Sequence, residues 1–153
     1  MKIGKRVNIL RGYLCIIKFV KKKSYTMNQQ MKNKEFILEY LNVLSGVIKT
    51  QEIMRKYISD EGLIDHIVFF DAVFPKYEMF TDEMTADGNR VVVRAHMTGR
   101  HEGEFGNIQP TYKTIDFPFV VGYEIENRMI VSHWLIADQM ALMEQLEGES
   151  VAA

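Results

Sequence analysis

The chain has little cysteine and no long apolar run. The first feature argues against a disulfide-bonded protein and the second against a membrane-spanning one. Cys15 is the single cysteine among 153 residues, so an internal disulfide is excluded and nothing points to an oxidising compartment. The longest apolar run near the start, Gly12 to Ile17, is broken by Lys18, is much too short to span a bilayer, and is followed by no small-residue cleavage site. We therefore expect a cytoplasmic protein without a signal peptide and without integral membrane association.

Several catalytic and ligand-binding motifs are also missing. The histidines have no helical metal-ligand spacing, no glycine-rich phosphate loop precedes a helical pattern, and no serine occupies a strand-to-helix elbow. We accordingly expect no metal site and no cofactor.

Acidic residues are absent from the first 23 positions, which hold eight of the 19 basic residues. The rest of the chain therefore carries 11 basic residues against all 20 acidic ones, which argues against nucleic acid as the partner of the folded part. We predict a flexible basic extension over residues 1–31, one domain over 32–148 and a tail over 149–153. The extension has three interpretations: a disordered or weakly helical segment, a basic arm for anionic surfaces, or sequence upstream of a natural start at Met27 or Met31.

A hydrophobic content of 47% and a charged content of 25% fit one domain with a sizeable core. Its first half has helical periodicity. Asn33 can cap a helix that Gly46 ends, a short helix is expected around Gln51 to Ile58, and a third helix follows Ser59 and stops before Pro75. Three helices therefore come first.

The second half reads as strands. Residues 77–85 and 90–98 flank a turn at Asp87-Gly88 and predict one hairpin, and residues 112–125 and 129–136 predict a second. A helix from Gln139 to Leu146 closes the chain. Helices followed by antiparallel strands indicate an α+β fold, whose sheet must curve if it encloses a cavity.

Three segments together resemble the SnoaL-like polyketide cyclases of the NTF2-like superfamily. They are Asp87-Gly88-Asn89-Arg90-Val91-Val92-Val93-Arg94, the run from Thr98 to Phe105, and His133-Trp134 with Asp138 before the closing helix. The resemblance covers about residues 33 to 147. It implies a cone-shaped barrel, in which a curved antiparallel sheet and N-terminal helices cover an apolar pocket, and a cofactor-free intramolecular aldol condensation in which Asp138 is the general acid and base. The superfamily also suggests a homodimer formed through the sheet.

Asp138 has two interpretations. In an apolar pocket its carboxylate could remove a proton next to a carbonyl group, whereas before a helix an aspartate is a favoured N-cap. Strand alternation places Trp134, Ile136 and Asp138 on one face and His133 on the other. We therefore assign Trp134, Ile136 and Asp138 to the pocket, with core packing as the alternative for Trp134, and treat His133 as a secondary candidate.

Three further residues are candidates for lining the pocket. His101 lies between Gly99 and Gly103 and matches the histidine of the family's Gly-x-His-x-Gly-x-Phe pattern, with Phe105 as its aromatic. An exposed loop histidine is the alternative for His101. His66 falls on the apolar stripe of the third helix, where a satisfied core histidine is the alternative.

The sequence thus supports an acid–base enzyme, of the cyclase, isomerase or lyase type, acting on a small hydrophobic carbonyl compound. Two alternatives remain. A non-enzymatic binding module would have the same cavity without dependence on the acid, and an assembly subunit would have its cavity filled by side chains such as Met79, Met97 and Met129.

Overall fold

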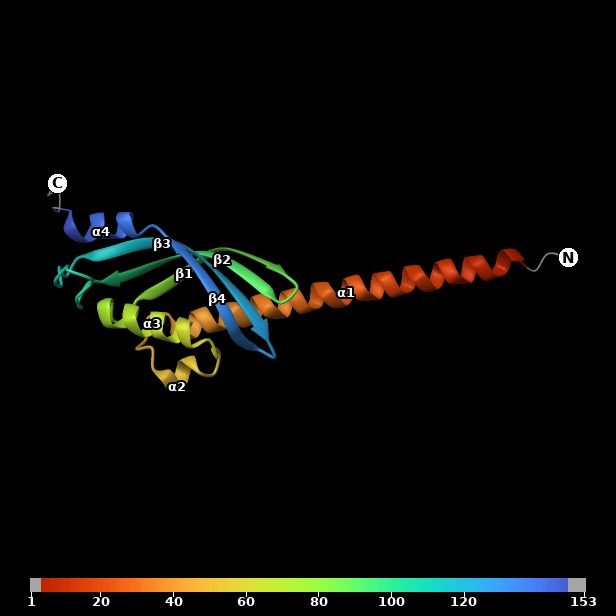
Figure 1. Cartoon of the computed structure of the whole chain (residues 1–153), viewed down its shortest axis with the longest axis horizontal. Helices are drawn as coiled ribbons and strands as arrows, with labels where there is room; N and C mark the ends of the chain where they lie inside the picture. The colour runs from red at the N-terminus through yellow and green to blue at the C-terminus, as the bar shows by residue number, and fades with distance from the viewer. Residues whose placement is uncertain (1–3, 149–153) are drawn as a thin grey trace.

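The computed structural model describes residues 4–148, with side chains from Ile16 onward except that of Tyr25. Three helices precede four strands, and a fourth helix follows them (Figure 1). The elements are α1 (Gly4–Leu44), α2 (Gln51–Met54), α3 (Glu61–Val73), β1 (Glu78–Asp87), β2 (Arg90–Arg100), β3 (Thr114–Glu126), β4 (Met129–Ala137) and α4 (Gln139–Glu147).

The helices differ from the sequence prediction mainly at the beginning of α1. This helix ends near Gly46 as predicted but begins at Gly4, well before Asn33. Asn33 is not an N-cap, because it lies inside the helix and its side-chain amide donates to the carbonyl of Gly88 at 3.0 Å. No proline interrupts residues 4–44, so nothing in the backbone stops the helix. The flexibility predicted for residues 1–31 stays a prediction, and the predicted tail over 149–153 lies outside the described residues.

Both predicted hairpins are confirmed in a single antiparallel sheet of order β1-β2-β3-β4. Asp87 pairs with Arg90 around Gly88, whose φ of 58° explains the glycine in this turn. The register brings Val93, Val121 and Leu135 side by side across three strands. The ladder is interrupted where Asp82 of β1, between Thr81 and Glu83, and Val131 of β4, opposite Glu124 and Ile125, are left out of the pairing.

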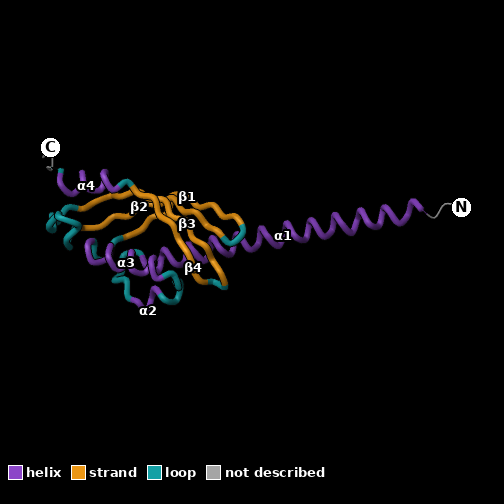
Figure 2. Tube along the Cα trace, in the orientation of Figure 1, coloured by secondary structure: helices purple, strands orange, loops and turns teal. Residues whose placement is uncertain are grey.

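The main core lies between one face of the curved sheet and the helices. Figure 2 shows α3 and the C-terminal part of α1 on this side of the strands, which we call the inner face. Buried side chains of α1, such as Ile37 and Leu44, pack against Val91 and Val93 of β2. A smaller cluster at the other end joins α4, through Leu142 and Leu146, to β2 and β3. The arrangement confirms the predicted α+β fold.

A buried ion pair ties the helices to the start of β1. The fully buried ammonium of Lys49 lies 3.2 Å from the Asp71 carboxylate and also donates to the carbonyls of Val47 and Tyr77, each at 3.1 Å. Burial lowers the pKa of Lys49, while Asp71 opposes that shift. Asp71 in turn accepts from the backbone N–H of Lys49 and Lys76. These bonds hold together the α1–α2 connection, the end of α3 and the first residue before β1.

Replacing Asp71 should lower the free energy of unfolding more than replacing Lys49. Asp71→Ala leaves a buried, uncompensated ammonium and should lower the free energy of unfolding by about 3 kcal/mol. Lys49→Met replaces the ammonium with an apolar chain of similar length and should cost clearly less. Urea unfolding followed by circular dichroism measures both. Lys56→Met, at an exposed pair, is the control and should change stability by less than about 0.5 kcal/mol. A larger loss in Lys49→Met than in Asp71→Ala would contradict this account.

Candidate functional site

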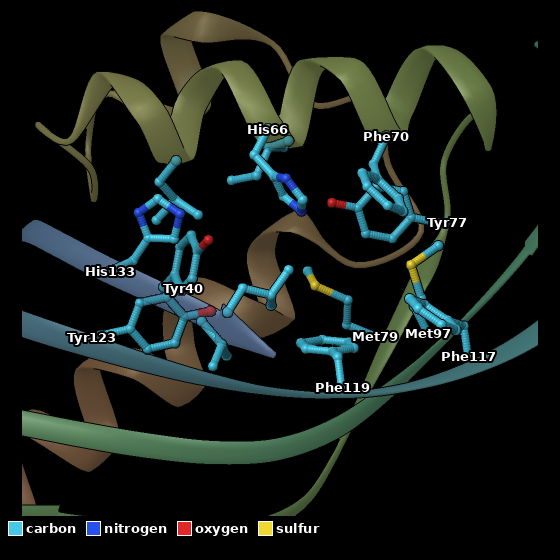
Figure 3. A pocket seen from close by; sticks show the side chains of 14 residues that line it. Tyr40, His66, Phe70, Tyr77, Met79, Met97, Phe117, Phe119, Tyr123 and His133 are labelled. Carbon is cyan, nitrogen blue, oxygen red and sulfur yellow. The ribbon is translucent and has the colours of Figure 1, made fainter. Parts of the chain in front are cut away.

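An apolar pocket lies between α3 and the inner face of the sheet (Figure 3). The cavity has a volume of about 60 Å³. Its wall combines aliphatic, aromatic and thioether side chains with three tyrosines and two histidines, and none of the described acidic residues lines it. The lining residues are Tyr40, Leu63, His66, Ile67, Phe70, Tyr77, Met79, Met97, Phe117, Phe119, Val121, Tyr123, His133 and Leu135.

Strand β4 presents the opposite face to the pocket from the one we predicted. His133 and Leu135 line it, whereas Trp134 and Ile136 lie on the outer face, 48% and 66% exposed. The indole of Trp134 covers Gly122 of β3, where a Cβ atom would overlap it. The alternation was correct, but both faces of β4 carry large apolar side chains, so the strand alone does not identify its inner face.

Asp138 lies outside the pocket, on the exposed surface at the end of β4. Its carboxylate accepts a hydrogen bond from the backbone N–H of Ala141 at 3.1 Å and caps α4. The structure therefore corrects the predicted placement of Asp138 and shows the helix cap that was its alternative.

His133 forms a hydrogen bond with a carboxylate at the start of α3. Its Nδ1 lies 2.6 Å from Oδ2 of Asp60, and the two side chains are 19% and 16% exposed. Asp60 is also the N-cap of α3, where its Oδ1 accepts from the backbone N–H of Leu63 at 3.2 Å. Burial acts to raise the pKa of Asp60, but the hydrogen bonds from His133, Leu63 and Gly62 outweigh it, so the pKa is lowered.

This pairing defines the chemistry available to His133. Because the Asp60 carboxylate is an acceptor, Nδ1 of His133 is the nitrogen that donates to it, and Nε2 is the nitrogen that can face a ligand. Nε2 forms no hydrogen bond with a described residue. From the sequence His133 is only a secondary candidate, and Asp60, 73 positions before it, is not a candidate at all. The only local signal for Asp60 is an acid at the start of a helical pattern.

His66 lines the pocket from α3, as predicted, whereas His133 lines it from β4 (Figure 3). Its ring packs on Phe70 at a centroid distance of 4.7 Å and makes no hydrogen bond with a described residue. Burial, and secondarily His133, lower the pKa of His66. His66 is therefore neutral near pH 7 and can give or accept one hydrogen bond.

Three tyrosines add hydroxyl groups to the cavity. Figure 3 shows the hydroxyl of Tyr77 directed toward His66, and those of Tyr40 and Tyr123 directed inward beside His133. The rings of Tyr40 and Tyr123 meet edge to face at 5.7 Å. Burial raises the pKa of all three phenols, so they stay protonated and can serve as donors. The sequence pattern did not single them out, because each occupies an ordinary apolar position.

His101 and Phe105 lie beside the pocket wall without lining it, which corrects their predicted placement. His101 is buried, and its Nδ1 accepts from the backbone N–H of Thr111 at 3.1 Å. Phe105 packs against Phe69 and Phe70 of α3. A Cβ atom at Gly103 would overlap the Ala72 carbonyl, so the glycine permits the close approach of this loop to α3.

His101 should make the fold sensitive to acid. Burial lowers its pKa, against a weaker opposing effect of the Gly103 backbone, so the folded state disfavours the proton that the unfolded chain binds near pH 6.5. The free energy of unfolding should then decrease as the pH falls below about 6.5, by at most about 1.4 kcal/mol per pH unit for one proton. Urea unfolding of wild type and His101→Gln at pH 7.5 and 5.5 tests this. Equal losses in the two proteins would show that His101 does not contribute.

Among residues 4–148 that carry described side chains, no group of three or more histidine, cysteine or acidic residues is arranged to hold a metal ion. The polar groups of the pocket are thus two imidazoles and three phenols, backed by one carboxylate. Such a set can transfer protons and donate hydrogen bonds to a developing negative charge.

A sequence model of the SnoaL-like polyketide cyclases matches residues 42–146, more than half of the chain. The chain belongs to this family, within the NTF2-like superfamily. No curated protein matches the sequence.

Solved structures show the same fold. One is a proposed SnoaL-like polyketide cyclase from Jannaschia sp. CCS1, with a TM-score of 0.69 and 20% identity over 79% of this chain and 95% of that one. AclR from Streptomyces galilaeus, a proposed hydroxylase, has a TM-score of 0.66 and 19% identity over 81% and 86% of the two chains. IdmH from Streptomyces antibioticus, a proposed polyketide cyclase, has a TM-score of 0.63 and 20% identity over 74% and 97%. Proteins that share this fold are thus described as cyclases and as a hydroxylase. The fold therefore does not identify the reaction of this chain, which has to be inferred from the residues of its site.

Proposed function

We propose that this chain is a cofactor-independent acid–base enzyme that acts on a small hydrophobic carbonyl compound, with His133 as its general base. The observation that carries the proposal is the 2.6 Å contact between His133 and Asp60 at the wall of an apolar pocket. A carboxylate behind an imidazole fixes its tautomer and stabilises the imidazolium that forms when it takes a proton.

The proposed reaction begins with proton removal from a carbon next to a carbonyl group. Nε2 of His133 takes the proton, and the electron pair of the C–H bond becomes an enolate whose oxygen accepts a hydrogen bond from a phenol such as Tyr123 or Tyr40. In an intramolecular aldol condensation the enolate carbon attacks a second carbonyl of the same molecule. The resulting alkoxide takes the proton back from His133, so no proton is gained or lost. In an isomerisation the proton returns to a different carbon.

The pocket restricts the substrate to an apolar molecule. Its present free space is small for a ligand site, since pockets for drug-sized molecules usually enclose several hundred Å³. Met79 and Met97 line one end (Figure 3), and methionine side chains rearrange at low cost. We propose that their movement opens the cavity to a flat ring system. Asp138 has no part in this mechanism because it lies outside the pocket.

A non-enzymatic binding module is the second candidate. None of the described acidic residues lines the pocket, and this favours the binding module, because no acid is needed to hold an apolar ligand. The two candidates differ in whether His133 affects turnover or only affinity. Mass spectrometry of compounds that co-purify with the protein would identify a ligand class for either.

Deuterium exchange at carbon isolates the first chemical step. We expect the wild type to speed deuterium incorporation at the α carbon of aryl β-keto esters in D₂O, measured by NMR with spontaneous exchange subtracted. His133→Gln should lower this rate by 10²-fold or more, because the base is lost, and Asp60→Asn by roughly 10-fold or more, because the tautomer is no longer fixed.

Asp138→Asn is the matched control, since asparagine also caps helices and the position lies outside the pocket; its rate should equal that of the wild type. An exchange rate that falls only in Asp138→Asn would show that Asp138, and not His133, is the general base. Ligand binding without exchange in the wild type would favour the binding module.

We also propose a homodimer formed through the outer face of the sheet. Trp134 and Ile136 are exposed there beside the half-buried Val120, and Phe80 is 44% exposed near the other edge. Exposed aromatic and aliphatic groups that share one sheet face are typical of an interface.

Ile136→Lys should weaken such a dimer at least 10-fold, because it buries a charge at the interface. Sedimentation equilibrium over a concentration series measures the effect. Ile48→Lys is the control, because Ile48 is 58% exposed in the α1–α2 connection rather than on the sheet. A monomeric wild type at tens of micromolar, or an Ile136→Lys variant that associates like the wild type, would contradict the proposal.

A further inference from the structure

The first part of α1 extends away from the domain. Figure 1 shows the helix projecting beyond the sheet, and every described side chain from Ile16 to Gln29 is exposed. Among the residues whose side chains are described, Asn33 is the first that is buried. At 1.5 Å per residue, the stretch from Gly4 to Gln29 is roughly 38 Å long. Nothing in the proposed enzymatic function uses this projection.

One side of the projecting helix is apolar. Ile16, Val20, Met27 and Met31 follow one another at spacings of four, seven and four, which places them on one stripe, and they are 56–61% exposed. Phe19, 69% exposed, flanks the stripe. A shallow groove follows this side, lined by Phe19, Val20, Lys23, Ser24, Met27, Asn28 and Met31. So many large apolar groups along an uncovered helix indicate a surface that another phase or molecule covers.

The other side of the helix is cationic. Helical spacing puts Lys18, Lys21 and Lys22 opposite the apolar stripe, and Lys23, on the apolar side, has a long stem that lets its ammonium reach a polar boundary. Residues 1–23 carry eight basic residues in all, and the first acid of the chain is Glu35. This helix therefore combines an apolar stripe with an uncompensated positive charge.

We propose that α1 binds the surface of an anionic bilayer, with its axis in the membrane plane and its apolar stripe in the headgroup boundary. Basic amphipathic helices bind membranes in this way, through apolar insertion together with attraction to acidic lipids. Within residues 4–148 no helix is long and apolar enough to cross a bilayer. A second copy of the helix would bring two strongly positive segments together, and nucleic acid would leave the apolar stripe uncovered. An anionic lipid surface can cover the apolar stripe and attract the cationic side at the same time. This inference does not rest on the proposed enzymatic function.

Vesicle sedimentation with the full chain tests the proposal. We expect binding to phosphatidylcholine vesicles that contain 30% phosphatidylserine, little binding to phosphatidylcholine alone, and a loss of binding in 0.5 M salt. Lys21→Glu with Lys22→Glu should weaken binding at least about twenty-fold, since each basic residue near the surface contributes about 1 kcal/mol. Phe19→Ser with Val20→Ser should weaken it about tenfold at unchanged charge, because apolar insertion is lost.

The matched control is Lys56→Glu with Lys76→Glu, which changes the net charge equally but lies on the folded domain; its binding should stay close to that of the wild type. Equal weakening by both charge variants would show a general charge effect and overturn the proposal. So would unchanged binding in Phe19→Ser with Val20→Ser, no binding to anionic vesicles, or lipid-independent self-association through this helix. Tighter binding to duplex DNA than to the vesicles, measured by fluorescence anisotropy, would assign the cationic side to nucleic acid instead.

Discussion

The candidate site depends on where α3 begins, and one short segment fixes that point on the sheet. Ile58 forms a bridge with Ile130, and the backbone N–H groups of Ser59 and Asp60 both donate to the Ile130 carbonyl, at 2.9 and 3.3 Å. The first turn of α3 is thereby fixed against the start of β4. Asp60 then serves two purposes with its two oxygens, since one caps the helix and the other holds His133. One carboxylate thus both caps the helix and holds the imidazole that we propose as the general base.

Sequence reasoning predicted the elements that depend on local patterns. The alternation in β2, the Asp87-Gly88 turn and the proline after α3 each specify a structure through nearby residues, and all three are found. The motif resemblance then supplied the fold, because it combines the order of these elements. The N-terminal boundary of α1 was missed, since a helix can continue without an apolar face toward the core when no residue breaks it.

The site was harder to predict because it depends on contacts between distant residues. Alternation in β4 separated His133 from Trp134 correctly, but only the packing of α3 decides which of the two faces the pocket. Asp60 lies at the start of α3 and His133 lies on β4, and no local pattern joins them. The Gly-x-His-x-Gly-x-Phe segment was misplaced for a related reason: its histidine points into a packed loop and bonds to Thr111 rather than to the cavity.

The two imidazoles of the pocket differ in their surroundings, and this difference supports separate roles. His133 has an anionic partner that can stabilise a positive charge, whereas His66 has an aromatic neighbour and a lowered pKa. In the proposed mechanism His133 therefore takes the proton, while His66, whose pKa burial lowers, orients a carbonyl group. Burial of the phenols keeps their protons in place as well. In the proposed reaction only His133 would change its charge, and neutral donors surround it, which is the condition for returning the same proton to the product.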